Sequence, residues 1–319
     1  MLQQIEFIKL QDQDAILHYC ILAKHELKVA KNGNQYLQLE VKDKSTTLIG
    51  RMWGGFENIL PELKGGLIIK IKGSAEVFQN NVTLKIDQLR LAVQSDNVDV
   101  SDFLPKSTRT FGEMKEELNK FISSIKNKHL SFLVKAIFNE DIIEKFATAP
   151  AAKNWHHAYI GGLLEHTLEI IKICELMCKL HPELKRDLLV CGALFHDFGK
   201  LKELSVGTDI YYTDEGKLLG HIVLGAMEIE NKIKEIPNFS DDLKNDLLHL
   251  ILSHQGKLEF ATPVVPKTLE AIVLYQADEL SAKTNAYKNA IGSGDLRQGN
   301  WTKFIQLAGT DLYLRNYEL

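Results

Sequence analysis

The stretch Leu194-Phe195-His196-Asp197-Phe198-Gly199-Lys200 (LFHDFGK) follows an apolar run, LLVCGA, that reads as a buried helix. It places an imidazole and a carboxylate side by side where core residues are expected. Burying either group without a partner costs several kcal/mol. A salt bridge, a hydrogen-bonded core pair or a metal ion therefore has to compensate for that cost.

Further histidines and acids recur at core-like positions around this stretch. They are His166 in GGLLEHT, His221 in LLGHI, His254 in LILSHQG and Asp278 in YQADEL. Each alone can be a hydrogen-bonded core residue. Together with His196 and Asp197 they form a mixed nitrogen and oxygen ligand set that suits first-row divalent metals. Six ligands exceed what one tetrahedral ion uses, so we expect two ions about 3.5–4 Å apart with a carboxylate between them.

The chain around these residues has helical periodicity. A T-x-x-E capping box at Thr110 predicts the first helix start. The stretch 203–219 is rich in turn and β residues, so we expect a loop or hairpin there. Helices are predicted over residues 114–125, 131–138, 141–148, 161–180, 183–200, 220–233, 240–254 and 266–287. These elements predict an all-helical domain at 110–300, followed by a C-terminal tail at 301–319.

The N-terminal part has strand-like runs separated by turn residues. Strands are predicted over residues 15–30, 35–43, 46–53, 67–78 and 82–93. Five strands with an inserted connection between the third and the fourth fit a small closed barrel of the OB type. A polar segment that ends in proline follows, so we expect the barrel domain at 1–95 and a linker at 96–109.

Composition bounds the class of protein. The 319 residues are 45% hydrophobic and 25% charged, with a net charge of −4 that divides into +2 for residues 1–95 and −6 for the remainder. This balance excludes a generally basic nucleic-acid coat, so a bound polyanion needs a local groove, stacking or cations. No apolar run approaches the roughly 20 residues of a membrane helix. The N-terminus lacks a signal-peptide layout, so we expect a cytoplasmic protein without a membrane partner.

The pattern H…HD…D, as His166, His196-Asp197 and Asp278, resembles the signature of the HD-domain metal phosphohydrolases, an all-helical superfamily. His221 and His254 match the extra ligands of its binuclear members. More closely, HHAYIGGLLEHTLEI, ALFHDFGK and LLGHIVLG after an OB-like barrel resemble the bacterial YhaM-type 3′-to-5′ exoribonucleases over nearly the whole chain. No GYP-type extension follows HDFGK, which weakens a cyclic-dinucleotide phosphodiesterase interpretation.

The resemblance implies a metal-dependent 3′-to-5′ exoribonuclease, with Mn²⁺ as the expected ion. Its substrate is expected to be single-stranded RNA, with single-stranded DNA as a second candidate, and its products nucleoside 5′-monophosphates. Two alternatives remain: a phosphohydrolase or phosphodiesterase of a small nucleotide, and a single-stranded nucleic-acid-binding protein with a vestigial site. The complete ligand set argues against the second alternative. The sequence leaves homo-oligomerisation open.

Asp197 is the predicted bridging catalytic residue. Three further residues near the expected ligands, Lys200, His156 and His157, are candidates for substrate contacts. Lys200 lies one helical turn beyond His196. Leaning on the resemblance, we favour Lys200 as a point charge for the scissile phosphate over a solvated lysine after a glycine cap. His156 and His157 are either phosphate contacts at the site mouth or helix-start residues.

In the barrel, aromatic and basic side chains are candidates for binding a single strand. Stacking on aromatic rings contributes about 1–3 kcal/mol per base without sequence preference. Alternation places Trp53 on the same side of its strand as Arg51, which indicates an exposed face. The candidates are Tyr36, Arg51, Trp53, Phe56 and Phe78, with Lys42, Lys44, Lys70 and Lys72 nearby. The alternative is that half of these aromatic side chains fill the barrel.

Overall fold

The computed structural model describes residues 4–78, 81–292, 297–306 and 308–314. The chain divides into two compact units, Met1–Pro105 with Gly207–Asp209, and Lys106–Val206 with Ile210–Leu319. The predicted boundary at residue 95 falls inside the first unit. The reason is local, because Asp96 pairs with Arg90 at 2.7 Å and accepts a hydrogen bond from the Tyr19 hydroxyl at 2.6 Å.

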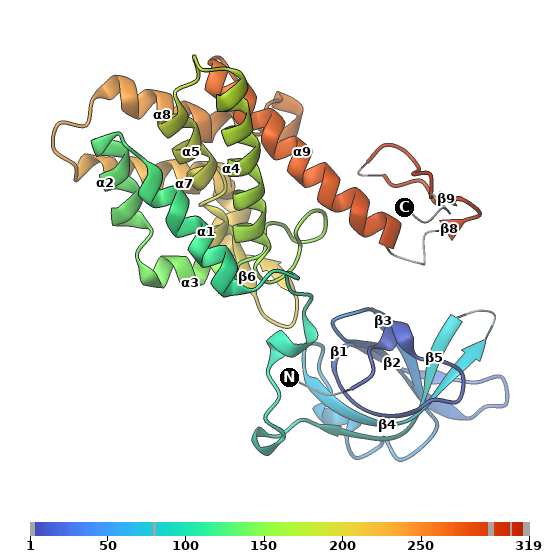
Figure 1. Cartoon of the computed structure of the whole chain (residues 1–319). Helices are drawn as coiled ribbons and strands as arrows, with labels where there is room; N and C mark the ends of the chain where they lie inside the picture. The colour runs from blue at the N-terminus through green and yellow to red at the C-terminus, as the bar shows by residue number, and fades with distance from the viewer. Residues whose placement is uncertain (1–3, 79–80, 293–296, 307, 315–319) are drawn as a thin grey trace. The chain divides into compact units, whose positions relative to one another are not determined.

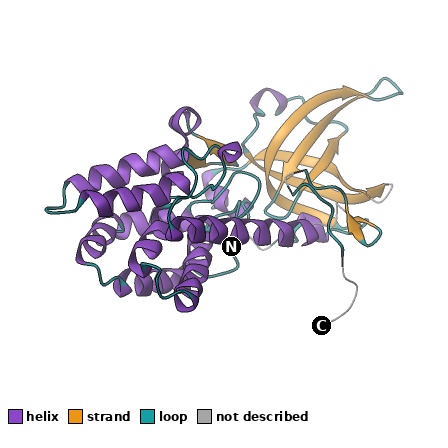
Figure 2. Ribbon diagram, turned by 90° about the horizontal axis from the view of Figure 1, so that it is seen from above, coloured by secondary structure: helices purple, strands orange, loops and turns teal. Residues whose placement is uncertain are grey.

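The first unit is a closed barrel (Figures 1 and 2), with neighbouring strands in the order β1-β2-β3-β5-β4 and β4 pairing back to β1. Its strands are β1 (Ala15–Val29), β2 (Gln35–Lys42), β3 (Thr47–Met52), β4 (Ile68–Phe78) and β5 (Asn81–Leu91). Only the β3–β5 pairing is parallel. This order is that of an OB-fold, which confirms the fold predicted from the strand-like runs. Alternate residues such as Leu37, Leu39 and Val41 fill the interior.

The second unit is a helical bundle. Its helices are α1 (Phe111–Ser124), α2 (Lys128–Ile137), α3 (Glu140–Thr148), α4 (Gly162–Leu180), α5 (Arg186–Phe195), α6 (Lys200–Glu203), α7 (Asp214–Lys234), α8 (Asp241–Ser253) and α9 (Leu269–Gly292). The predicted capping box is present at the start of α1, where Thr110 Oγ1 accepts from the Glu113 amide. Helices α5 and α9 both pack against α4, so the ends of several helices meet around one centre.

Two regions differ from the predicted elements. The helix expected over 183–200 ends at Phe195, and a turn separates α5 from α6. The expected hairpin is present as β6 (Leu204–Val206) and β7 (Ile210–Tyr212), but α7 starts at Asp214, inside the predicted loop. The Thr213 hydroxyl caps this helix by accepting from the Gly216 amide at 2.9 Å. Gly220, with φ of 72°, then breaks the helix just before His221.

Near the C-terminus a short hairpin pairs β8 (Arg297–Gln298) with β9 (Trp301–Thr302). It starts before the tail predicted at 301–319 and so crosses that boundary. Within the described residues, no helix combines the length and the apolar character that a membrane span requires.

Candidate metal centre

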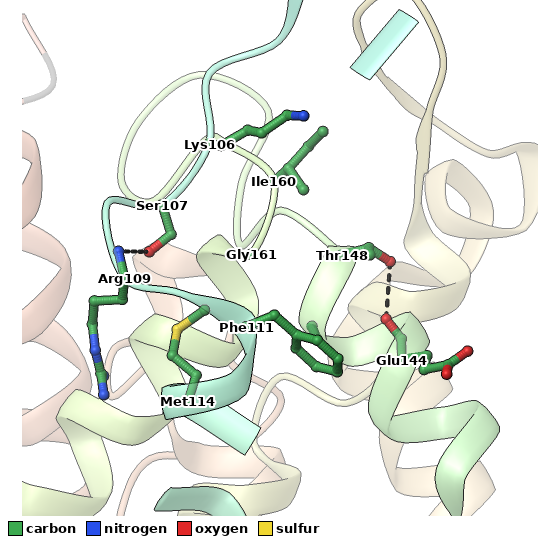
Figure 3. A pocket seen from close by; sticks show the side chains of 10 residues that line it. Lys106, Ser107, Arg109, Phe111, Met114, Glu144, Thr148, Ile160 and Gly161 are labelled. Atoms are coloured by element: carbon green, nitrogen blue, oxygen red, sulfur yellow. Dashed lines mark hydrogen bonds between the residues drawn. The ribbon is translucent and has the colours of Figure 1, made fainter. Parts of the chain in front are cut away.

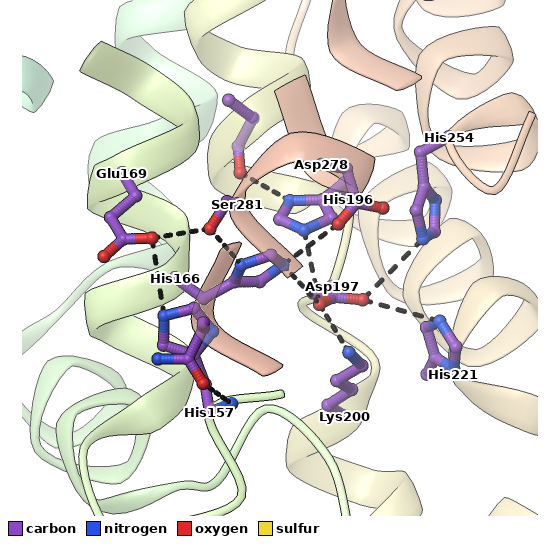
Figure 4. A network of polar contacts seen from close by, with 12 residues as sticks. His157, His166, Glu169, His196, Asp197, Lys200, His221, His254, Asp278 and Ser281 are labelled. Carbon is purple, nitrogen blue, oxygen red and sulfur yellow. Dashed lines mark hydrogen bonds and ion pairs between the residues drawn. The ribbon is translucent and has the colours of Figure 1, made fainter. Parts of the chain in front are cut away.

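The structure brings all six predicted metal ligands together in the second unit (Figure 4). They come from five helices or helix ends, far apart in the sequence. His166 lies on α4, His196 and Asp197 follow α5, His221 lies on α7, His254 follows α8, and Asp278 lies on α9. The candidate centre is therefore assembled by tertiary packing and not by one local motif.

Asp197 lies in the middle of this cluster, with a different pair of histidines facing each carboxylate oxygen. Its Oδ2 is 3.2 Å from His196 Nε2 and 3.7 Å from His166 Nε2. Its Oδ1 is 3.4 Å from His221 Nε2 and 3.7 Å from His254 Nε2. A carboxylate that bridges two cations needs this arrangement, in which each oxygen faces a separate group of ligands. The first group is His166 and His196, and the second group is His221 and His254.

Asp278 completes the first group, because its Oδ1 is 3.0 Å from His166 Nε2. Most ligand atoms of the cluster are buried and have no hydrogen-bond partner, a state that is costly for polar groups. These unpartnered atoms are Nε2 of His166, His196, His221 and His254, and Oδ1 of Asp197. Imidazole nitrogens and carboxylate oxygens within 4.8 Å of one another fit a divalent cation. The donor set therefore suits the binding of a divalent metal.

Backbone carbonyls fix the ring orientation of two of the histidines. His196 Nδ1 donates to the Ala193 carbonyl at 2.8 Å, and His254 Nδ1 donates to the Ile251 carbonyl at 2.7 Å. Because a carbonyl only accepts, Nδ1 carries the proton in both rings. The lone pair of Nε2 is then left facing the centre, as a metal-binding histidine requires.

Side chains perform the same task for the other two histidines. His221 Nδ1 is 3.1 Å from Glu203 Oε1. His166 Nδ1 is 2.9 Å from the hydroxyl of Ser281, which donates onward to Glu169 Oε2 at 2.6 Å. Sequence reasoning missed Glu203, Ser281 and Glu169, because they belong to no recognisable motif. Glu203 and Ser281 meet their histidines only through packing, and Glu169 acts through the Ser281 hydroxyl.

Lys200 is buried, 7% exposed, with its Nζ 2.6 Å from Asp197 Oδ2. The alternative of a solvated lysine after a glycine cap is therefore wrong, because the turn after α5 directs the side chain inward. Burial raises the pKa of the Asp197 carboxyl, but the charge of Lys200 and then that of His196 outweigh burial and hold it well below its usual range. The carboxylate is thus kept ionised.

Gly199 allows the backbone of this turn to touch α7. A Cβ atom at position 199 would lie 1.9 Å from the His221 carbonyl oxygen and 2.6 Å from the Gly225 amide nitrogen. No side chain fits in that space. The close backbone approach places Asp197 and His221 on the same centre.

His156 and His157 lie in the connection between α3 and α4, with ring centroids 4.8 Å and 5.0 Å from that of His166. Since α4 begins at Gly162, they are not helix-start residues. Nδ1 of His156 and both ring nitrogens of His157 are buried without a hydrogen-bond partner. His157 Nε2 lies 3.4 Å from Glu169 Oε2.

A pocket of about 410 Å³ lies beside the end of the same connection, between α1 and α3 (Figure 3). Phe111 and Met114 of α1, Ala147 of α3 and Ile160 of the connection line it. None of the predicted site residues is among its lining residues, so the pocket is separate from the metal centre.

In the barrel, the Tyr36 and Trp53 rings contact each other, with centroids 4.8 Å apart, and Trp53 is 52% exposed. Arg51 is half-buried on β3. Phe56 is 4% exposed, so its prediction as a stacking residue is wrong and it fills the barrel instead. The Phe78 side chain lies outside the described residues. An aromatic pair, half-buried at Tyr36 and exposed at Trp53, is therefore present next to β3.

The chain was compared with family models, solved structures and curated proteins. A model of the HD domain family matches residues 163–283, and a model described as a putative helicase matches residues 107–181. The first match covers His166 through Asp278, so the second unit contains an HD domain over residues 163–283. Among solved structures, the second OB-fold domain of replication protein A from Methanococcus maripaludis aligns with 28% of this chain and 95% of its own length, at 16% identity and a TM-score of 0.24.

Curated relatives match nearly the whole length. The 3′-5′ exoribonuclease YhaM of Bacillus subtilis is 31% identical, covering 90% of each chain. The YhaM of Oceanobacillus iheyensis is 34% identical, also covering 90% of each chain, and that of Geobacillus sp. is 32% identical, covering 90% of this chain and 87% of the relative. The chain therefore belongs to the YhaM family of 3′-5′ exoribonucleases.

Proposed function

We propose that this protein is a metal-dependent 3′-to-5′ exoribonuclease that hydrolyses single-stranded RNA to nucleoside 5′-monophosphates. Membership of the YhaM family supports the activity and the polarity. The observation that carries the site is Asp197, whose two oxygens face separate histidine pairs in a buried cluster of unpartnered nitrogens.

Two divalent ions, with Mn²⁺ expected from the family resemblance, fit this ligand set. His166, His196 and Asp278 would hold one ion, His221 and His254 the other, and Asp197 would bridge them. When bound, such ions supply a nucleophile from water near neutral pH and offset charge on the phosphoryl oxygens. The fixed Nδ1 partners keep the ligand rings oriented, so little reorganisation is needed on binding.

Three further side chains are proposed to contact the substrate phosphates. Lys200 brings a buried ammonium group next to the centre, and a point charge there stabilises the scissile phosphate. His156 and His157 offer ring nitrogens that have no hydrogen-bond partner beside His166. A neutral imidazole can donate one hydrogen bond to a phosphate oxygen.

The barrel is proposed to hold the strand. The half-buried Tyr36 and the exposed Trp53 form an aromatic pair, and Arg51 lies on β3 just before Trp53. Such a surface stacks on bases without sequence preference. We therefore propose single-stranded RNA as the partner, with single-stranded DNA as a second candidate and the cytoplasm as the compartment.

RNA labelled at its 5′ end tests the proposal. It should shorten stepwise in the presence of Mn²⁺ while nucleoside 5′-monophosphates accumulate. A stable 3′ hairpin should stall the enzyme, because paired bases cannot stack on aromatic side chains. Circular single-stranded RNA of the same sequence is the control, since it has no end. Circles cut as fast as linear strands, or 3′-monophosphates as the early product, would contradict the assignment.

A further inference from the structure

We propose that Ser281 and Asn285, four residues apart on α9, are positioning residues with separate tasks. Ser281 orients the metal ligand His166, whereas Asn285 holds the turn that carries His157. This inference rests on the proposed function, in which His166 binds a cation and His157 contacts the substrate. It adds that metal affinity and substrate affinity are controlled by different residues of the same helix.

Ser281 fixes both the ring and the tautomer of His166. Its side chain is buried, 3% exposed, and its hydroxyl lies 2.9 Å from His166 Nδ1. The hydroxyl proton goes to Glu169 Oε2 at 2.6 Å, because a carboxylate only accepts. Ser281 therefore accepts from Nδ1, and Nε2 is left facing Asp278. Without the hydroxyl the ring can rotate or change tautomer, either of which weakens a metal ligand.

Asn285 contacts the His157 turn at two points. Its Oδ1 accepts from the His157 amide at 2.8 Å. Its Nδ2 donates to the Tyr159 hydroxyl at 3.2 Å, and that hydroxyl is 3.0 Å from Glu165 Oε2. One amide side chain therefore connects α9 to two residues of the turn.

The turn needs such support, because His157 has a φ of 46°, in the left-handed region. A non-glycine residue stays in this region only when its surroundings determine it from several sides. The His157 carbonyl accepts from the Ala151 and Tyr159 amides at 3.1 and 2.9 Å. A Cβ at Gly162 would lie 2.0 Å from that carbonyl oxygen. Asn285 supplies the remaining contact, to the His157 amide.

The spacing explains why one helix can perform both tasks. Asp278, Ser281 and Asn285 are at positions i, i+3 and i+7 of α9, which lie on one helix face. Figure 4 shows Asp278 and Ser281 on either side of the His166 ring. The helix thus presents a ligand, a support for a ligand and a support for the turn in succession.

The test compares Ser281→Ala and Asn285→Ala with Thr284→Ala, an exposed neighbour on the same helix. Three quantities are measured: Mn²⁺ affinity of the metal-free full chain by calorimetry, KM and kcat on a short RNA, and amide hydrogen exchange over residues 151–160.

Ser281→Ala should weaken Mn²⁺ binding by about 10–100-fold with unchanged exchange in the turn. Asn285→Ala should raise KM about tenfold and speed exchange at His157, with unchanged Mn²⁺ affinity. Thr284→Ala should match the wild type.

Conservative variants separate positioning from general damage. Ser281→Thr keeps the hydroxyl and Asn285→Asp keeps the acceptor for the His157 amide, so each should recover most of the loss. The inference is overturned if the two alanine variants change the same quantities, or if neither differs from Thr284→Ala. Failure of the proposed function is distinct: the wild type would then bind no Mn²⁺ or leave RNA intact, while the exchange comparison would still report whether Asn285 holds the turn.

Discussion

Among the residues that the structure describes, each unit buries one aspartate that is nearly inaccessible, Asp43 in the barrel at 3% and Asp197 in the helical unit at 2%. The Asp43 oxygens accept from the amides of Phe7, Ser45 and Thr46 and from the Ser45 hydroxyl. The Asp197 oxygens face imidazole nitrogens that have no hydrogen-bond partner. Burial is nearly equal, so the nature of the partners separates a structural carboxylate, Asp43, from Asp197, the proposed metal ligand.

The largest effect expected from this comparison is on catalysis. Asp197→Asn removes the charge that both ligand groups share, so RNA hydrolysis should fall by at least about 10²–10³-fold. The matched variant Asp43→Asn should retain activity but lose about 1–3 kcal/mol of stability, because an amide nitrogen replaces an oxygen that accepts hydrogen bonds. Steady-state hydrolysis and chemical denaturation of both variants check this. Equal activity in the two variants would show that the bridge is assigned wrongly.

The second largest effect concerns the pH dependence of the stability of the metal-free protein, which we expect to arise from the buried histidines of the helical unit. Burial, and then the charge of His196, lower the pKa of His254 to about 4 from its ordinary 6.5. As the pH falls below about 6.5, the unfolded chain takes up a proton that the folded chain refuses, so stability is full above this range and declines down to about pH 4.

The loss assigned to His254 amounts to about 3 kcal/mol. His196 acts in the opposite direction, since Asp197 outweighs burial and raises its pKa. Denaturation of metal-free His254→Gln across this range should give a flatter profile than the wild type. An unchanged slope would exclude His254 as a source of the pH dependence.

Metal should stabilise only the helical unit, because the six ligands all lie there. At a free concentration of 100 times its dissociation constant, an ion that binds only the folded state adds about 2.7 kcal/mol. Thermal unfolding with and without Mn²⁺ should therefore shift the transition of the helical unit, and Asp197→Asn should reduce that shift. A shift of the same size in Asp197→Asn would place the ion elsewhere.

The smallest expected effect concerns Trp53, the exposed member of the aromatic pair in the barrel. Trp53→Ala should weaken binding to long single-stranded RNA by about 1–3 kcal/mol, with little change in the rate of cleaving very short RNA. Leu17→Ala, which truncates another exposed side chain of the barrel, is the control. Binding titrations on long and short RNA check this, and equal losses for both lengths would point to a structural role for Trp53.

The sequence predicted the parts of the site that depend on residue type and missed those that depend on packing. The six clustered side chains could be picked out because imidazoles and carboxylates are rare in apolar helices, as at His166 and Asp278. Ser281 and Asn285 were missed because they act on residues more than 100 positions away. Phe56 was misassigned because alternation along β3 does not extend past the strand end to show which ring is buried.

Gly199 has a consequence for the way mutational tolerance will be distributed over this protein. A Cβ atom at this position would lie only 1.9 Å from the His221 carbonyl oxygen. Even alanine should therefore displace the backbone that carries His196 and Asp197. A saturation scan should therefore score this glycine as harshly as the histidines, although it binds no ion and touches no substrate. A ranking by intolerance to substitution alone would class Gly199 with the residues that bind metal or substrate. Separate assays of folding and of metal uptake are needed to show that its role is in backbone packing.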